Sequence, residues 1–428
     1  MGTSACARGA LLLVLACFTF SATVGAAEPL SLSRIIDYSL RHNGELGAFR
    51  EEKGIRDAAL VRAGLFPNPS LEVEAASGAL TESSAENSVS LGVSQEFLLA
   101  DKRRKRQNVA ERELEIYSLQ LADRERTIRE EVKMAFYAAI LAKKRVELTE
   151  QVVLLNRQLL HVAGERLAAG DIPELELNLV KVELNRAEAD KITAANALHQ
   201  REASLAILMG LPPGAPVAIA GEFAGGPGVG TPAELLTRVY NNRPDLKALE
   251  AEKSRGDAEI ALAGAEGIPN VTAALTFSRE RTALDVGSEE VTDTDYLVGV
   301  RLSVPIPIFD RNGAGVREAR ARRNSAETRL SAAKRSIERE FSAAYAGYEN
   351  SERILSIYKT EIIPQLEENL KLSQEAYRLG EIGILEVIQE QKKFFEVSDG
   401  HLTALHDRQT ALVKLEAVTA SELTGGEK

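Results

Sequence analysis

Two carboxylates repeat at the same distance from a turn glycine in two distant parts of the chain. Glu176 lies six residues after Gly170, and Glu386 lies six residues after Gly380. Acidic side chains gathered at a constriction attract cations and repel anions, which is the chemistry of an ion-selective gate. A solvated carboxylate on a helix face explains each residue about as well, so both interpretations stay open.

The two glycines belong to matching turns. Gly170-Asp171-Ile172 aligns with Gly380-Glu381-Ile382, and a helical pattern runs into and out of each turn. Glycine permits the left-handed backbone that reverses a helix. The turns therefore predict the ends of two helical hairpins, and they serve either as docking points for a partner protein or as plain turns.

Basic residues gather where two predicted strands give way to helices. Lys102, Arg103 and Arg104 open a run of five basic residues after the second strand, and Arg311 follows the fourth. Such positions suit contact with lipid headgroups, although a solvated helix start explains them nearly as well. The formal net charge of −11 disfavours nucleic acid as a partner.

Catalytic and metal-binding patterns are missing from the sequence. The five histidines form no ligand cluster, and both cysteines, Cys6 and Cys17, lie close to the N-terminus. Neither H-E-x-x-H nor G-x-S-x-G occurs. The sequence predicts no enzyme, no cofactor and no metal site.

Residues 1–27 have the pattern of a secretory signal peptide. An apolar run of about a dozen residues is too short to span a membrane, and small residues up to Ala27 suggest a cleavage site. Lipidation at Cys17 is the alternative, although Leu15 and Ala16 make a poor lipid-attachment motif.

The rest of the chain divides into two similar repeats, residues 28–213 and 231–428, joined by a Gly- and Pro-rich linker at 214–230. Strict alternation of apolar and polar residues predicts two strands in each repeat. The predicted strands are at about 69–76, 88–97, 270–278 and 295–304. A polar loop is expected at Arg279–Asp295.

Each pair of strands is followed by a long helical hairpin, at about 101–209 and 313–424. Apolar residues recur every seven positions, and the first helix should run for about 65–70 residues, or about 100 Å. A helix of that length needs a coiled-coil setting. Pro364 interrupts the second long helix, where we expect a kink.

Four strands leave unpaired edges and are too few to close a barrel, so oligomerisation must complete the sheet. Three chains would give twelve antiparallel strands of a length that suits an outer membrane. The predicted fold is mainly α with a transmembrane β part: a long α-helical coiled-coil barrel and a 12-stranded β-barrel completed by a homotrimer. A soluble coiled-coil rod is the alternative.

Several motifs resemble those of the TolC-type outer-membrane efflux proteins, over nearly the whole chain after residue 27. The motifs most resemble the outer-membrane component of cobalt–zinc–cadmium resistance pumps. They are Phe66-Pro67-Asn68-Pro69, Ala100-Asp101-Lys102-Arg103, Pro305–Gly313, Tyr377-Arg378-Leu379-Gly380 and Leu385-Glu386-Val387.

This resemblance implies a homotrimeric exit duct in the outer membrane of a Gram-negative bacterium, extending into the periplasm. The implied partners are a periplasmic adaptor that meets the hairpin turns, an inner-membrane RND-type pump and outer-membrane lipid. Divalent heavy-metal cations are the expected substrate. The alternatives are the same duct serving drug efflux or type I polypeptide secretion, and a periplasmic coiled-coil adaptor.

The resemblance also implies a periplasmic gate near the second turn, with Tyr377, Glu386 and Glu176 as candidates. In drug-efflux relatives an acidic residue here helps to hold the entrance closed. Those relatives have a basic residue two positions after the glycine, where this chain has Ile382. An ion-pair lock therefore lacks its expected basic partner.

Overall fold

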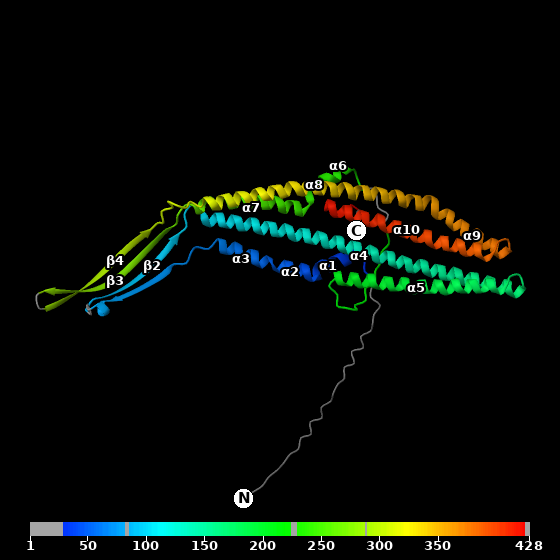
Figure 1. Cartoon of the computed structure of the whole chain (residues 1–428), viewed down its shortest axis with the longest axis horizontal. Coiled ribbons are helices and arrows are strands. Elements are labelled where there is room, and N and C mark those ends of the chain that lie inside the picture. The colour runs from blue at the N-terminus through cyan, green and yellow to red at the C-terminus, as the bar shows by residue number, and fades with distance from the viewer. Residues whose placement is uncertain (1–28, 82–84, 224–228, 287–288, 424–428) are drawn as a thin grey trace, which may run out of the picture.

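The protein is an elongated molecule with a β-sheet at one end and long helices that run to the other end (Figure 1). The computed structural model describes residues 29–81, 85–223, 229–286 and 289–423. The expected signal peptide, Cys17 included, lies outside the described residues.

The helices are α1 (Leu32–His42), α2 (Gly44–Glu51), α3 (Lys53–Ala63), α4 (Lys102–Ala169), α5 (Glu174–Leu208), α6 (Pro232–Asn242), α7 (Pro244–Glu266), α8 (Gly313–Ile357), α9 (Ile363–Leu379) and α10 (Ile384–Thr419). A short 3₁₀ turn spans Gly78–Thr81, and a π-helical turn, Tyr358–Ile362, joins α8 to α9. The strands are β1 (Ser70–Ser77), β2 (Asn87–Phe97), β3 (Val271–Val286) and β4 (Glu289–Ser303).

The four strands form one antiparallel sheet in the order β1-β2-β3-β4. The central pairing joins the two repeats, because β2 of the first repeat lies against β3 of the second. Strands β1 and β4 are the two edges of the sheet.

Strands β3 and β4 are longer than the sequence indicates. The prediction of a polar loop at Arg279–Asp295 is wrong for most of that range. Arg279 pairs with Tyr296, and the strand pairing continues to Val286 and Glu289. A polar stretch shows no alternation of apolar residues, yet its backbone can extend a ladder that apolar residues have started.

One face of the sheet is apolar and exposed. Leu71, Val93, Leu275 and Val300 lie side by side across the four strands, and Val300 is 76% exposed. The opposite face carries small and charged side chains, because successive residues of a strand point to opposite faces.

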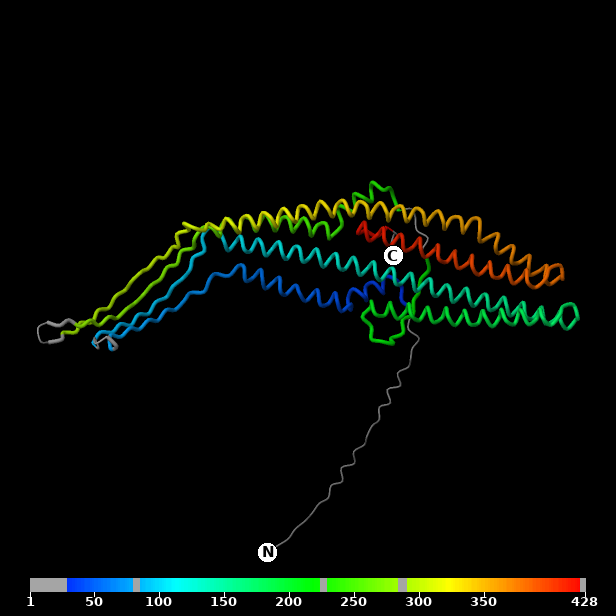
Figure 2. Tube along the Cα trace, in the orientation of Figure 1, coloured from blue at the N-terminus to red at the C-terminus, as the bar shows by residue number. Residues whose placement is uncertain are grey.

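The helices form two hairpins that end together at the far end of the molecule (Figure 2). The first hairpin is α4 followed by α5, and α4 is one unbroken helix of 68 residues. The second hairpin consists of α8 and α9, followed by α10. The π-helical turn lies just before Pro364, where the sequence predicts a kink.

The helices pack side by side. Helix α4 contacts α3 and α5 on one side and α7 and α10 on the other, and α8 packs against α7 and α10. No helix within the described part of the chain is both long enough and apolar enough to cross a membrane.

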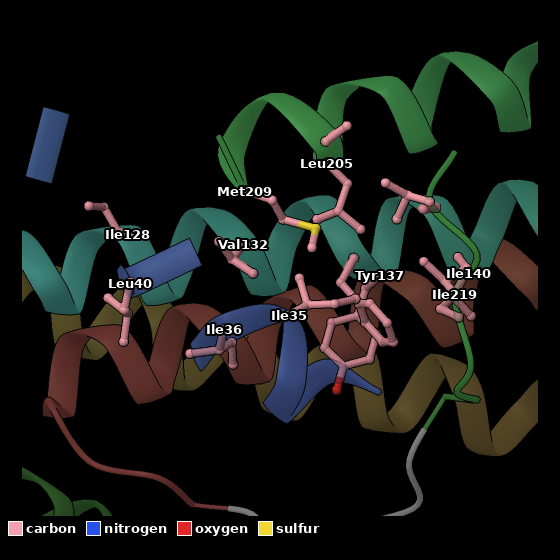
Figure 3. Packing of buried hydrophobic residues seen from close by; sticks show 14 of the residues in the cluster. Ile35, Ile36, Leu40, Ile128, Val132, Tyr137, Ile140, Leu205, Met209 and Ile219 are labelled. Atoms are coloured by element: carbon pink, nitrogen blue, oxygen red, sulfur yellow. The ribbon is translucent and has the colours of Figure 1, made fainter. Parts of the chain in front are cut away.

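The largest core cluster lies midway along the helices. Ile35 of α1, Val132 of α4 and Leu205 of α5 are fully buried there, with Ile219 of the linker beside Ile140 (Figure 3). The linker is fixed to the segment just before α1 by a hydrogen bond of 2.9 Å from the Leu30 amide to the Ala218 carbonyl. This cluster ties both ends of the first repeat to α4.

Candidate functional site at the helical tip

Both hairpin turns have the geometry that glycine permits. Gly170 and Gly380 have φ values of 82° and 80°. The Asp171 amide donates to the Arg166 carbonyl at 2.9 Å, and the Glu381 amide donates to the Ala376 carbonyl at 2.8 Å. These bonds satisfy carbonyls that the helix ends would leave unpaired.

A small hydrophobic cluster, the tip cluster, joins the two hairpins. Its buried members are Leu159, Ala163, Ile172, Val180, Tyr377, Ile384, Val387 and Ile388. They come from α4, α5, α9, α10 and the first turn, so the residues at the two turns share one core. The tip is therefore a single packed unit.

Tyr377 lies at the centre of this unit and is 1% exposed. The Arg166 guanidinium carbon lies 4.7 Å from the centre of the tyrosine ring. Its Nη1 donates a hydrogen bond of 2.9 Å to the Tyr377 carbonyl. A cation over an aromatic face is attracted by the ring, so Arg166 links the first hairpin to the second.

Glu176 is the other gate candidate that lies near Tyr377. Burial raises the pKa of the Tyr377 hydroxyl, and the negative charge of Glu176 raises it further, which together outweigh the opposing effect of Arg166. The tyrosine therefore stays neutral at physiological pH. Its hydroxyl has no hydrogen-bond partner within the described chain.

Glu386 has a local role in α10. Its carboxylate Oε2 accepts a hydrogen bond of 2.6 Å from the Gly383 amide, which stabilises the first turn of the helix. The side chain is exposed. Among the described contacts, none joins Glu386 to Tyr377 or Glu176.

The six turn residues differ in exposure. Gly170, Asp171, Gly380 and Glu381 are exposed, whereas Ile172 is only 7% exposed. Ile382 is partly buried against the same tip cluster. Of the six turn residues, the charged side chains that a partner could reach are therefore those of Asp171 and Glu381, and both are acidic.

Lys102 lies at the opposite end of the helices and is 4% exposed. Its Nζ donates to the Ile268 carbonyl and, at 2.5 Å, to Asn270 Oδ1. This side chain fastens the start of α4 to the turn between α7 and β3, so its ammonium group is turned away from the surface.

The other basic candidates at that end are more open. Arg103 lies with its guanidinium carbon 4.2 Å from the centre of the Phe66 ring. Arg104 and Arg311 are exposed, and Arg311 Nε donates to the Pro307 carbonyl at 3.3 Å.

Arg166 is the tip residue that sequence reasoning missed. The resemblance implies a basic residue two positions after Gly380, where the chain has Ile382, and the basic partner comes instead from Arg166, four residues before Gly170. The sequence carried one hint of this role: Arg166 aligns with Ala376 when Gly170 is aligned with Gly380, so only the first turn has an arginine at this position. Within the described residues, no group of three or more His, Cys, Asp or Glu side chains is placed to hold a metal ion.

The family model described as "Outer membrane efflux protein" matches residues 47–211 and 235–421. The cobalt-zinc-cadmium resistance protein CzcC of Cupriavidus metallidurans is 25% identical over 395 residues, which cover 92% of this chain and 90% of that protein. The nickel-cobalt-cadmium resistance protein NccC of Alcaligenes xylosoxydans xylosoxydans is 26% identical over 278 residues, 64% of this chain and 60% of that protein.

Among solved structures, the chain is similar to CusC, whose crystal structures concern folding and transmembrane channel formation. The TM-score is 0.72, with 18% sequence identity and 92% of each chain covered. At this identity the likeness establishes the fold, which is that of a TolC-like channel.

Proposed function

The chain belongs to the outer membrane efflux protein family, and on this premise we propose that it forms the exit duct of a tripartite efflux system. The observation that carries the proposal is the sheet: four strands with an exposed apolar face and two unpaired edges, attached to helices that end in one tip. Unpaired strand edges are not tolerated in lipid, so a second copy must cover them.

The internal repeat supplies a template for that contact. Phe66-Pro67-Asn68 corresponds to Ile268-Pro269-Asn270, which makes Leu71 of β1 the counterpart of Ala273 of β3. Leu71 pairs with Val93, and Ala273 pairs with Leu302. Val93 and Leu302 are therefore counterparts on β2 and β4.

The pairing of β2 with β3 then gives the register between copies. Val93 pairs with Leu275, and the counterpart of Leu275 on β1 is Val73. Leu302 of one copy should lie opposite Val73 of the next. Both residues are on the apolar face, so this register keeps the apolar face continuous from one copy to the next. A shift of the pairing by one residue would instead place apolar side chains beside polar ones.

Three copies joined in this way would close a 12-stranded barrel with its apolar face toward lipid. Arg103, Arg104 and Arg311 would lie near the headgroups of the inner leaflet. The helices would continue the duct into the periplasm, with the tip as its entrance. We propose that Tyr377, Glu176 and Glu386 line this entrance, and that a periplasmic adaptor docks on the exposed turns.

Divalent heavy-metal cations are the proposed substrate. The names of CzcC and NccC refer to metal resistance, and the polar face of the sheet carries an excess of negative charge. Its carboxylates are Glu72, Glu74, Glu96, Glu280, Asp293 and Asp295, against the basic Arg301 among the described side chains. A lumen lined in this way would favour cations over anions.

Two measurements test the proposal. Membrane fractionation should find a heat-modifiable trimer in the outer membrane, and a soluble periplasmic monomer would rule out the duct. Deleting the gene should then lower tolerance to zinc, cobalt or cadmium, and the full-length gene should restore it. If the deletion lowered tolerance only to detergents and organic drugs, the duct would be supported, but its substrates would be organic molecules and not metal cations.

A further inference from the structure

Two arginines follow the apolar residues of β3 on the same face of the sheet. The strand starts beside the helices at Val271 and runs away from them (Figure 1). Arg279 and Arg281 lie beyond Leu275 and Phe277 along it. Because successive residues of a strand point to opposite faces, all four side chains belong to the exposed apolar face.

An aromatic pair ends the apolar face at the level of these arginines. Phe277 of β3 and Tyr296 of β4 stack with their ring centres 6.2 Å apart, and Arg279 pairs directly with Tyr296. From Val304, just after β4, to Tyr296 the apolar positions extend for about 27 Å along the strand. A tilt of about 40° makes this a height of about 20 Å, close to the apolar band of an outer-membrane barrel, which aromatic residues border. The arginines therefore lie at and just beyond the border of that band.

The charges on β3 are sorted between its two faces. Arg279-Glu280-Arg281 alternates in sign, so both arginines point to the apolar face and the glutamate points to the polar face. Glu280 lies opposite Asp295 there. At the level of Arg281 the described side chains on the apolar face of the other strands are uncharged, namely Ser77, Asn87, Thr292 and Thr294. The two positive charges thus stand together without a carboxylate beside them among these side chains.

Both guanidinium groups are accessible. Arg279 is exposed and Arg281 is partly exposed. Arg281 Nη2 donates to Thr292 Oγ1 at 3.2 Å, a bond that orients the guanidinium along the sheet and uses one of its five N–H groups. Guanidinium groups bind phosphate through pairs of parallel N–H···O bonds. Two of them at the border of an apolar band fit a phosphate that is held at the level of lipid headgroups.

We propose that Arg279 and Arg281 form a binding site for a phosphate-bearing lipid of the outer leaflet, with one site on each copy. The phosphate pairs with the two guanidinium groups, and the acyl chains of the same lipid cover Leu275 and Val298 of the apolar face. The site lies at the opposite end of the strands from the basic residues placed near the inner leaflet. The inference rests on the proposed function, because it takes the apolar face to lie in a bilayer.

Native mass spectrometry of the full-length trimer in detergent tests the site with two probes. One is lipid A that carries both phosphates, and the other is the same lipid A after phosphatase treatment. The unchanged protein should bind the phosphorylated probe about tenfold more tightly, the effect of charge-assisted hydrogen bonds. Arg279→Gln combined with Arg281→Gln should remove this preference. Arg279→Lys with Arg281→Lys should keep part of it, since an ammonium group retains the charge but not the paired bonds.

Arg301→Gln is the matched control, because Arg301 is an exposed arginine of β4 that lies on the polar face of the same sheet. It should leave the tenfold preference unchanged. Equal affinity of the unchanged protein for the two probes would overturn the lipid site, as would an equal loss of preference in the Arg301 variant.

The outcomes separate the lipid site from the duct. Heat-modifiable migration should first show that each variant still forms trimers. Trimers from the outer membrane that bind both probes alike would overturn the lipid site and leave the duct. Trimers that prefer the phosphorylated probe but conduct no current in planar bilayers would keep the site and remove the duct. A soluble periplasmic monomer would overturn both, because its apolar face would not meet a bilayer.

Discussion

Arg166 of the first hairpin and Tyr377 of the second are joined twice, by a hydrogen bond of 2.9 Å to the tyrosine carbonyl and by the guanidinium above the ring. The two residues are 211 positions apart in the chain. The contact makes the tip of one hairpin depend on the other.

Replacing Arg166 should loosen the tip. Arg166→Ala removes both contacts and should raise the leak conductance of the closed duct several-fold in planar bilayers, while trimer yield stays unchanged. Arg157→Ala is the control, because Arg157 forms an exposed ion pair with Glu188 inside the first hairpin. Equal leak from the two variants would rule out a closing role for Arg166.

Glu386 combines a capping bond with a proposed gate charge, and Glu386→Gln separates the two. Glutamine keeps an acceptor for the Gly383 amide but removes the charge, so cation selectivity should fall while thermal stability is kept. Glu386→Ala should also cost about 1 kcal/mol of helix stability. Unaltered conductance, selectivity and closed-state leak in both variants would remove Glu386 from the gate.

Cysteine pairs test the proposed register between copies. Leu302→Cys with Val73→Cys should give intermolecular disulfides, because directly opposed strand residues have Cα atoms about 4.5–5.5 Å apart, within disulfide range. The chain has two native cysteines, Cys6 and Cys17, and replacing both with serine gives a clean background. Val298→Cys with Val73→Cys is the out-of-register control, and equal yields would contradict the register.

Arg243 should carry much of the stability at the junction of α7, α8 and α10. It forms a bidentate pair with Asp245, at 3.0 and 2.8 Å, and reaches the Val418 carbonyl at 3.3 Å. Arg243→Ala removes these bonds, leaves the buried side of the Asp245 carboxylate without its cation and should lower the free energy of unfolding by about 2–3 kcal/mol. Thermal unfolding followed by circular dichroism measures this, with the exposed Arg238→Ala as control.

The same pair predicts a pH dependence. Burial alone would raise the pKa of the Asp245 carboxyl, but hydrogen bonds from Arg243 outweigh it and hold the pKa below its usual range. Its stabilisation is therefore complete above about pH 4, the usual value for an unfolded aspartate, and is lost as the pH falls through the lower folded value. Arg243→Ala should remove this acid-side loss.

The two-repeat plan and the long helices were predictable because their signals are local. Alternation identified the apolar parts of all four strands, and the seven-residue period identified α4. The outer halves of β3 and β4 were missed, since their polar residues pair through the backbone and carry no apolar pattern.

The side-chain roles at the candidate site were less predictable, because each depends on a distant part of the chain. The position of Lys102 after the second strand predicts contact with lipid headgroups. In the structure its ammonium group instead binds the carbonyl of Ile268, which is 166 residues away. Arg166 depends on Tyr377 in the same way. Residue type and spacing indicate such groups, but the packing of two repeats decides what they touch.

The unequal lengths of the two strand pairs have a consequence for the outer rim of the assembly. Strand β2 begins opposite Arg281, and β3 continues five residues further, to Val286, a height of about 17 Å. Threefold repetition would alternate three tall hairpins with three short ones. The strand ladder at the rim would then be uneven, with three high segments alternating with three low ones around the mouth of the duct.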